Sequence, residues 1–191
     1  MNLTKKVILA SQSPRRRELL QALNVDFQVR VKEVDESFDA TMPAAEVAEF
    51  LACKKASAYD LSADELLITS DTVVVVDGKV LGKPIDRADA INMIESMSGK
   101  THQVISAYCL RTANEQISGD AVTAVTFRNL SIDEIQFYVD TYKPFDKAGA
   151  YGIQEWIGMV GIEEIKGSYY NVMGLPVDKI YQALQAYRHQ E

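Results

Sequence analysis

The sequence predicts an α/β protein. Strand-like and helix-like hydrophobic patterns alternate along nearly all of its 191 residues, without an internal repeat or a linker-like stretch. The hydrophobic fraction of 47% and the charged fraction of 25% are typical of a globular protein, not of a disordered chain or a coiled coil. A chain of this length can form one domain, or one domain with two lobes, around a sizeable core.

The first elements form a strand–helix–strand unit. Residues 7–10 are a short apolar run that predicts a strand. Ser13 is a favourable helix N-cap and Pro14 suits the first helical position, so a helix should begin there. Apolar and polar residues then alternate over 27–31, which predicts a second strand with one buried face.

The middle of the chain also predicts helices and strands in alternation. Residues 43–59 have helical spacing, and residues 66–70 and 72–76 predict strand, interrupted by the charged Asp71 between them. The pair Asp77-Gly78 predicts a tight hairpin turn, because both central positions of that turn need a positive φ. A further helix should open at Asp86 and stop at Gly99.

The last third adds strands and two helices. Ser131 and Glu134 have the spacing of a capping box, which predicts a helix from this point. The other elements expected here are long antiparallel strands over 102–111 and 121–128, short strands over 159–165 and 169–173, and a final helix after Pro176.

Charge limits the partners of the protein. Twenty basic and 27 acidic side chains give a net charge of −7, and a field of that sign repels DNA, RNA and acidic membrane surfaces. The apolar run 7–10 is too short for a signal peptide, and no apolar run is long enough to span a bilayer. We therefore expect a cytoplasmic protein that acts on a small molecule and binds neither nucleic acid nor a membrane.

The thiol and imidazole groups suggest no metal site. Cys53 and Cys109 lack the paired spacing of a disulfide framework or a zinc site, so we interpret both as core thiols. His102 and His189 have no metal-ligand spacing either. We assign these two histidines structural or surface roles.

A basic cluster marks the start of the first helix. The segment 11–17 reads Ser-Gln-Ser-Pro-Arg-Arg-Arg, and a helix N-terminus already offers free N–H groups and a positive dipole end. Arginines there oppose the dipole, so an anion such as phosphate would stabilise them. The alternative is a solvated basic helix end with a satisfied N-cap.

Asp71 is the second unusual residue, because it interrupts an apolar β-branched run. An unpaired charge buried there would be costly, so Asp71 needs a cation, a metal ion or N–H donors, or else a raised pKa suited to acid–base chemistry. The alternative is a bend between two strands, with Asp71 bonded to local backbone.

Nearby charges could complete such a site. Asp35 and Glu36 follow the second strand and could join Asp71 as oxygen ligands for Mg²⁺, although each alone could equally be a surface acid. Lys55 and Lys83 are candidate point charges for phosphate, with solvated surface lysines as the alternative.

Six short segments, spread over almost the entire chain, form a recognisable set: 8–16, 70–74, 81–84, 98–102, 146–154 and 167–176. In this order they resemble the motifs of the Maf (septum formation inhibitor) family of nucleoside triphosphate pyrophosphatases. The resemblance implies a two-lobed α/β domain over residues 1–191, with a long twisted mixed sheet flanked by helices, as in inosine triphosphate pyrophosphatase. It also implies a nucleotide cleft between the lobes and allows a homodimer.

The same resemblance implies a reaction and a set of residues. Family members hydrolyse a nucleoside triphosphate to the monophosphate and pyrophosphate with a divalent cation, Mg²⁺ or Mn²⁺. The positions that match the polar catalytic set are Ser11, Arg16, Glu36, Lys55, Asp71 and Lys83, with Asp71 in the place of the proton acceptor. Whether Asp71 acts as base or, with Glu36, as metal ligand stays open. The positions that match those associated with base choice are Arg15, Thr72 and Gln154.

The ending Gly152-Ile153-Gln154 resembles the subgroup that acts on dTTP and UTP, with the 7-methyl-GTP subgroup as an alternative. The next residues, 155–157, are bulkier than the resemblance implies and could alter how the cleft closes. A second alternative is a nucleotide-binding regulator of cell division without turnover. The acidic Asp71 favours an enzyme, because binding a triphosphate alone does not require a carboxylate beside its negative charge.

Overall fold

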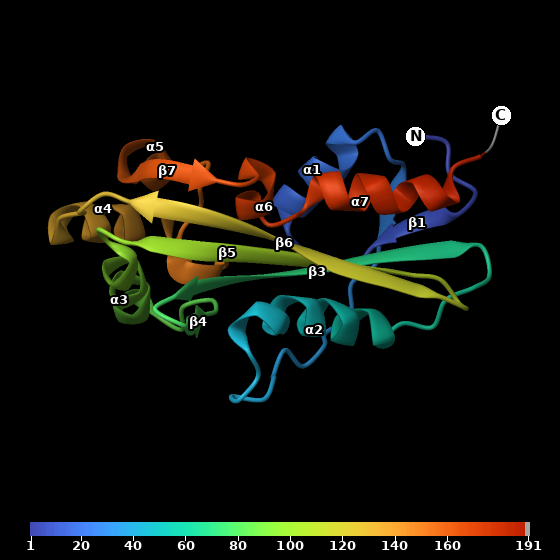
Figure 1. Ribbon diagram of the computed structural model, residues 1–191, viewed down its shortest axis with the longest axis horizontal. Coiled ribbons are helices and arrows are strands. Elements are labelled where there is room, and N and C mark those ends of the chain that lie inside the picture. The colour runs from blue at the N-terminus through green and yellow to red at the C-terminus, as the bar shows by residue number, and fades with distance from the viewer. Residues whose placement is uncertain (190–191) are drawn as a thin grey trace. The chain divides into compact units, whose positions relative to one another are not determined.

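The computed structural model describes residues 1–189 (Figure 1). Its strands are β1 (Lys6–Leu9), β2 (Phe27–Val29), β3 (Glu65–Val76), β4 (Lys79–Leu81), β5 (Thr101–Arg111), β6 (Gln116–Phe127) and β7 (Ile162–Lys166). Its α-helices are α1 (Pro14–Ala22), α2 (Ala44–Ser57), α3 (Arg87–Met97), α4 (Ile132–Tyr142), α5 (Trp156–Gly161), α6 (Tyr169–Met173) and α7 (Val177–Leu184). Two short 3₁₀ helices, η1 (Ala148–Ala150) and η2 (Gln185–Tyr187), complete the fold.

The strands form one mixed sheet in the order β2-β1-β3-β5-β6-β7, with β4 paired to β3. This arrangement confirms the predicted α/β class with a mixed sheet. The chain falls into two compact units, and β3, β5 and β6 contribute residues to both. Unit 1 contains residues 1–71, 106–121 and the chain from Gly174 onward, whereas unit 2 contains residues 72–105 and 122–173.

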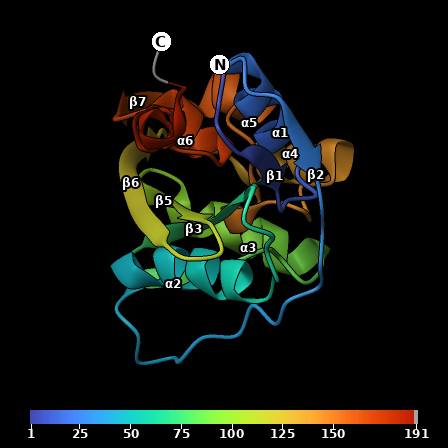
Figure 2. The same cartoon turned by 90° about the vertical axis from the view of Figure 1, so that its right-hand side faces the viewer.

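Unit 1 is built on parallel strands. β1 pairs in parallel with β2 on one side and with β3 on the other, and α1 crosses over between β1 and β2. Helices α1 and α7 lie on one face of this part of the sheet and α2 on the other (Figure 1), and Figure 2 shows α1 and α2 on opposite faces from a second direction. Side chains such as Leu9, Leu20 and Leu67 are fully buried between these layers.

Unit 2 begins with the hairpin that the sequence predicts. Asp77 and Gly78 have φ values of 49° and 75°, and β4 returns antiparallel to β3. Helix α3 packs against α4 and η1, while β6 pairs antiparallel with β7.

The predicted helix starts are confirmed by their caps. The Ser13 hydroxyl accepts from the Arg16 N–H, and Asp86 accepts from the Asp89 N–H at 2.8 Å. At the start of α4, the Ser131 hydroxyl accepts from the Glu134 N–H while the Glu134 carboxylate accepts from the Ser131 N–H. These contacts are local, which is why the sequence predicts them.

One strand prediction in this region is wrong and another is wrong in part. Residues 169–173 form helix α6, because Gly167 turns the chain at φ 132° and Ser168 then caps a helical turn through the Asn171 N–H. The strand expected over 159–165 begins only at Ile162, because the residues before it complete α5.

The second strand also differs from its prediction. β2 is three residues long and pairs only with β1, so it is an edge of the sheet. Val29 and Val31 are 42% and 40% exposed, where the alternation predicts a buried face. In contrast, β3 runs unbroken through Asp71, so the alternative of a bend at that residue is wrong.

Other predictions concern burial. Cys109 is buried and Cys53 half-buried, and both thiols are free. None of the helices formed by residues 1–189 combines the length and hydrophobicity needed to cross a membrane.

His102 lies in the core of unit 2, which confirms a structural role. Its Nε2 lies 2.8 Å from the Tyr151 hydroxyl, and its ring meets Phe127 and Tyr151 edge to face. Its Nδ1 is buried without a hydrogen-bond partner among the described residues. Burial therefore favours the neutral ring and lowers the pKa of His102 to about 4.

This histidine should make the fold sensitive to acid. Because the pKa is lower in the folded chain than its ordinary value of 6.5, the unfolded chain binds more protons below that pH. The free energy of unfolding is therefore unaffected by this group above pH 6.5. As the pH falls from 6.5 towards 4, that free energy decreases by about 3 kcal/mol in total. Urea unfolding of wild type and His102→Gln across this window measures the effect. Equal pH dependence in both proteins would contradict it.

Candidate functional site

Asp71 is held by a lysine from the helix beneath it. Asp71 is 8% exposed, and its Oδ1 forms an ion pair and hydrogen bond with Lys55 Nζ. The same Nζ lies 2.8 Å from Glu36 Oε1. Lys55 therefore bridges a buried and a half-exposed carboxylate. Of the partners that the sequence leaves open for Asp71, the structure shows a cation.

Helix α2 places this lysine. Its apolar face, including Val47 and Leu51, is buried, and the Thr69 hydroxyl donates to the Ala52 carbonyl at 2.7 Å, which ties β3 to the helix. Lys55 follows Ala52 by about one turn and lies in the last turn of α2, where the helix dipole favours a cation.

Arg16 comes from the first turn of α1 and lies beside the same acidic groups. Its Nη1 donates to the Ser70 carbonyl at 2.7 Å and its Nε to the Gly174 carbonyl at 2.8 Å. Burial lowers the pKa of Arg16, and the charges of Asp71 and Glu36 oppose that change. The guanidinium thus stays a cation fixed in direction by two backbone carbonyls.

The loop between β1 and α1 supplies two further candidates. Ser11 is 6% exposed, and its hydroxyl accepts from the Ser13 N–H at 3.2 Å. Arg15 is half-buried, and its charge lowers the pKa of Arg16 further. The candidates that unit 1 contains are Ser11, Arg15, Arg16, Glu36, Lys55 and Asp71.

Unit 2 contains the other three candidates. Thr72 is half-buried and follows Asp71 in β3, whereas Lys83 is exposed just after β4. Gln154 is exposed just before α5. Within this unit the Gly149 N–H donates to the Gly82 carbonyl at 3.0 Å, so the segment that carries Lys83 contacts the segment that leads to Gln154. The nucleotide cleft stays a prediction.

Asp35 does not join Asp71, contrary to one expectation. Its Oδ2 lies 3.0 Å from Lys54 Nζ, and it also bonds to Ser37. Hydrogen bonds from Ser37 and then from Lys54 lower the pKa of Asp35 to about 2. Of the two neighbouring acids, Glu36 alone shares Lys55 with Asp71, and Asp35 is a surface acid.

The carboxylates of Asp71 and Glu36 suit a divalent cation whose remaining ligands are phosphate and water. Asp71 and Glu36 both contact one ammonium group, so their oxygens lie within reach of one site. Within residues 1–189 no group of three or more histidine, cysteine or acidic side chains is placed to hold a metal ion. Mg²⁺ commonly takes one or two carboxylates and completes its shell with phosphate and water. The residues therefore fit a cation that binds together with a triphosphate.

Sequence reasoning missed the roles of Tyr138, Lys147 and Glu155. Lys147 is 9% exposed and pairs with Glu155 across 3.1 Å, and Tyr138 donates to the same carboxylate. The lysine just before the small residues 148–150 is the signal that could have indicated a buried ion pair.

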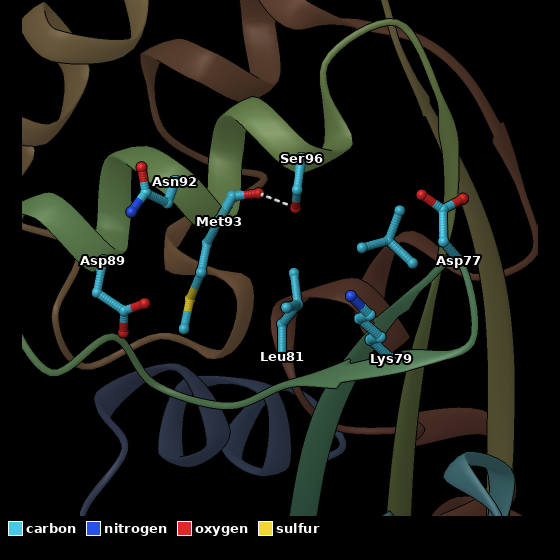
Figure 3. Close-up of a pocket in the computed structure, with 8 residues that line it drawn as sticks. Asp77, Lys79, Leu81, Asp89, Asn92, Met93 and Ser96 are labelled. Atoms are coloured by element: carbon cyan, nitrogen blue, oxygen red, sulfur yellow. Dashed lines mark hydrogen bonds between the residues drawn. The ribbon is translucent and has the colours of Figure 1, made fainter.

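A separate pocket of about 260 Å³ lies in unit 2 between α3 and the β3–β4 hairpin. In Figure 3, Asn92 and Met93 extend from the helix, and Leu81 and Lys79 face them from the hairpin. Its lining residues differ from the candidate site residues, so it is not the predicted substrate site.

The fold is that of an α/β protein in which Lys55 bridges the carboxylates of Asp71 and Glu36. The family described as "Maf-like protein" matches residues 6–187, and the chain belongs to this family. A Bacteroides fragilis protein named dTTP/UTP pyrophosphatase is 54% identical over 183 residues, which cover 94% of this chain and 95% of the relative. A Phocaeicola vulgatus protein of the same name is 52% identical and covers 96% and 97%.

Solved structures support the fold. The Ham1 protein of Staphylococcus aureus superposes with a TM-score of 0.54 over 95% of this chain and 99% of that chain. At 14% sequence identity this likeness concerns the fold alone, and it supports the expected fold, a mixed sheet flanked by helices.

Proposed function

We propose that this protein hydrolyses nucleoside triphosphates, dTTP and UTP first, to the monophosphate and pyrophosphate. The observation that carries the proposal is the buried Asp71 carboxylate, joined through Lys55 to Glu36 and flanked by Arg16. The names of relatives more than 50% identical over nearly the whole chain support the same reaction.

Each group has a role in that reaction. Asp71 accepts a proton from the water that attacks the α-phosphorus, or would instead hold a divalent cation together with Glu36. The bond from the α-phosphorus to the bridging oxygen breaks, and pyrophosphate leaves with that oxygen. Arg16, Lys55 and Lys83 offset the charge of the phosphates, and Ser11 offers a hydroxyl to them. A divalent cation, Mg²⁺ or Mn²⁺ held by Asp71 and Glu36, would supply further neutralisation of that charge.

The products distinguish this reaction from γ-phosphate release. Incubation with a panel of triphosphates and Mg²⁺ or Mn²⁺ should yield monophosphate and pyrophosphate, fastest with dTTP or UTP, because the cations favour pyrophosphate as the leaving group. Anion-exchange chromatography of the products measures the outcome. Diphosphate with orthophosphate would refute the mechanism. No turnover with either metal would instead indicate a nucleotide-binding regulator.

Asp71→Asn tests the proposed acid–base or metal-binding group. The substitution keeps the shape and removes the charge, so turnover should fall at least about a hundredfold. Steady-state kinetics measure this loss, and circular dichroism checks that the variant folds. A folded variant with near-normal turnover would remove Asp71 from the mechanism.

Gln154 should contribute to base choice with Arg15 and Thr72. A polar group that pairs with one base edge is left unpaired by another base, which penalises the wrong substrate. Gln154→Ala should therefore narrow the preference for dTTP and UTP over purine triphosphates by about tenfold. The ratio of kcat/KM values measures this preference, and an unchanged ratio would make Gln154 a structural residue.

A further inference from the structure

The exposed Gln154 is presented by a closed four-residue turn. The Glu155 N–H donates to the Gly152 carbonyl at 3.0 Å, so residues 152–155 form a hydrogen-bonded turn. One central residue, Ile153, is 5% exposed and packs into unit 2, whereas the other, Gln154, is exposed. The backbone of the turn therefore sets where the Gln154 amide can reach.

Tyr138 of α4 links both ends of this turn. Its hydroxyl accepts from the Gly152 N–H at 3.0 Å and donates to Glu155 Oε2. The tyrosine is fully buried. Burial, and then the Glu155 carboxylate, raise the pKa of Tyr138, so its hydroxyl remains a proton donor throughout the physiological range.

Lys147 holds the other oxygen of Glu155. Its Nζ lies 3.1 Å from Glu155 Oε1 and 2.7 Å from Asp146 Oδ1, with 10% of its side chain exposed. A Cβ on Gly152 would lie 2.9 Å from Glu155 Cδ and 3.0 Å from Lys147 Cε. The ion pair is therefore packed directly against the turn and leaves no room for a side chain at Gly152.

Helix α5, which follows the turn, also packs closely against it. A Cβ on Gly158 would lie 1.9 Å from the Ile153 carbonyl oxygen, and the Gly158 N–H donates to the Glu155 carbonyl at 3.0 Å. The turn is thus fixed by α4 on one side and by α5 on the other.

We propose that Tyr138, Glu155 and Lys147 form a clamp that positions Gln154 for reading the base of the nucleotide. This inference rests on the proposed function and deepens it, because it assigns base discrimination to three positioning residues behind Gln154. A polar group held in one orientation discriminates better than a mobile one, since a mobile group can adjust to the wrong base. The clamp should therefore affect the choice of base more than the rate of bond cleavage.

Tyr138→Phe removes one oxygen from the clamp. The preference for UTP over GTP, as a ratio of kcat/KM values, should fall about tenfold, while kcat for UTP changes less than about threefold. Hydrogen exchange at the Gly152 and Glu155 amides should become faster. Tyr142→Phe is the matched control: Tyr142 lies one turn along α4, stacks on Tyr138 at 5.2 Å, and should leave the ratio unchanged.

A double-substitution cycle shows whether the clamp acts through Gln154. Adding Tyr138→Phe to Gln154→Ala should leave the UTP/GTP ratio at the value of Gln154→Ala alone, because residues that act as a unit are not additive. Glu155→Gln provides a second variant if Tyr138→Phe does not fold, and it should lower the ratio in the same way.

The outcomes separate the inference from the proposed function. If Gln154→Ala lowers the ratio but Tyr138→Phe and Glu155→Gln do not, the clamp is merely structural and the inference is overturned. Additive effects of Tyr138→Phe and Gln154→Ala would overturn it too. If the wild type releases no pyrophosphate from any triphosphate, the proposed function fails first, and the inference fails with it.

Discussion

The pairing of Asp71 with Lys55 is the constraint on which the rest of unit 1 depends. A carboxylate buried in the middle of a twelve-residue strand needs a compensating partner, and in this protein the partner is the Lys55 ammonium group. That requirement fixes the last turn of α2 against β3, and the second contact of Lys55 brings Glu36 from the loop before α2 to the same place. Arg16, anchored on the carbonyls of Ser70 and Gly174, adds a second cation beside the acids. The candidate catalytic groups Glu36, Lys55 and Asp71 are thus brought together by the same charge compensation that lets the chain fold around Asp71.

The sequence predicts those features of the fold that depend on neighbouring residues, or on a buried charge that would be unfavourable without a partner. Ser13, Asp86 and Ser131 cap their helices through residues three positions away, so their roles follow directly from spacing. Asp77-Gly78 predicts its turn because few residues adopt its backbone angles. Asp71 predicts a compensating cation, metal ion or set of N–H donors, because an unpaired charge buried in a strand is unfavourable. The sequence indicates Lys55 only as a candidate charge for phosphate, and its pairing with Asp71 is seen only in the fold.

The sequence predictions fail where contacts between distant residues determine the secondary structure or the pairing of side chains. Residues 169–173 read as a strand, but Gly167 turns the chain and the buried Asn171 amide donates to Val104 and Thr123, which a helical turn allows. The alternation of apolar and polar residues over 27–31 cannot show that β2 is an edge strand whose Val29 is exposed. Asp35 and Glu36 are adjacent in sequence, yet only the fold shows that they bind different lysines. Tyr138 and Glu155, seventeen residues apart, meet through packing alone, so no spacing rule finds them.

The most direct test of this account is a double-mutant cycle on Lys55 and Asp71, read as the free energy of unfolding in urea. Lys55→Met leaves the Asp71 carboxylate buried without its cation and should lower that free energy by about 3 kcal/mol. Adding Asp71→Asn removes the unpaired buried charge and should recover most of the lost free energy of unfolding, so the effects of the two substitutions are strongly coupled. Additive effects, or a Lys55→Met protein as stable as wild type, would contradict the claim that Lys55 compensates Asp71.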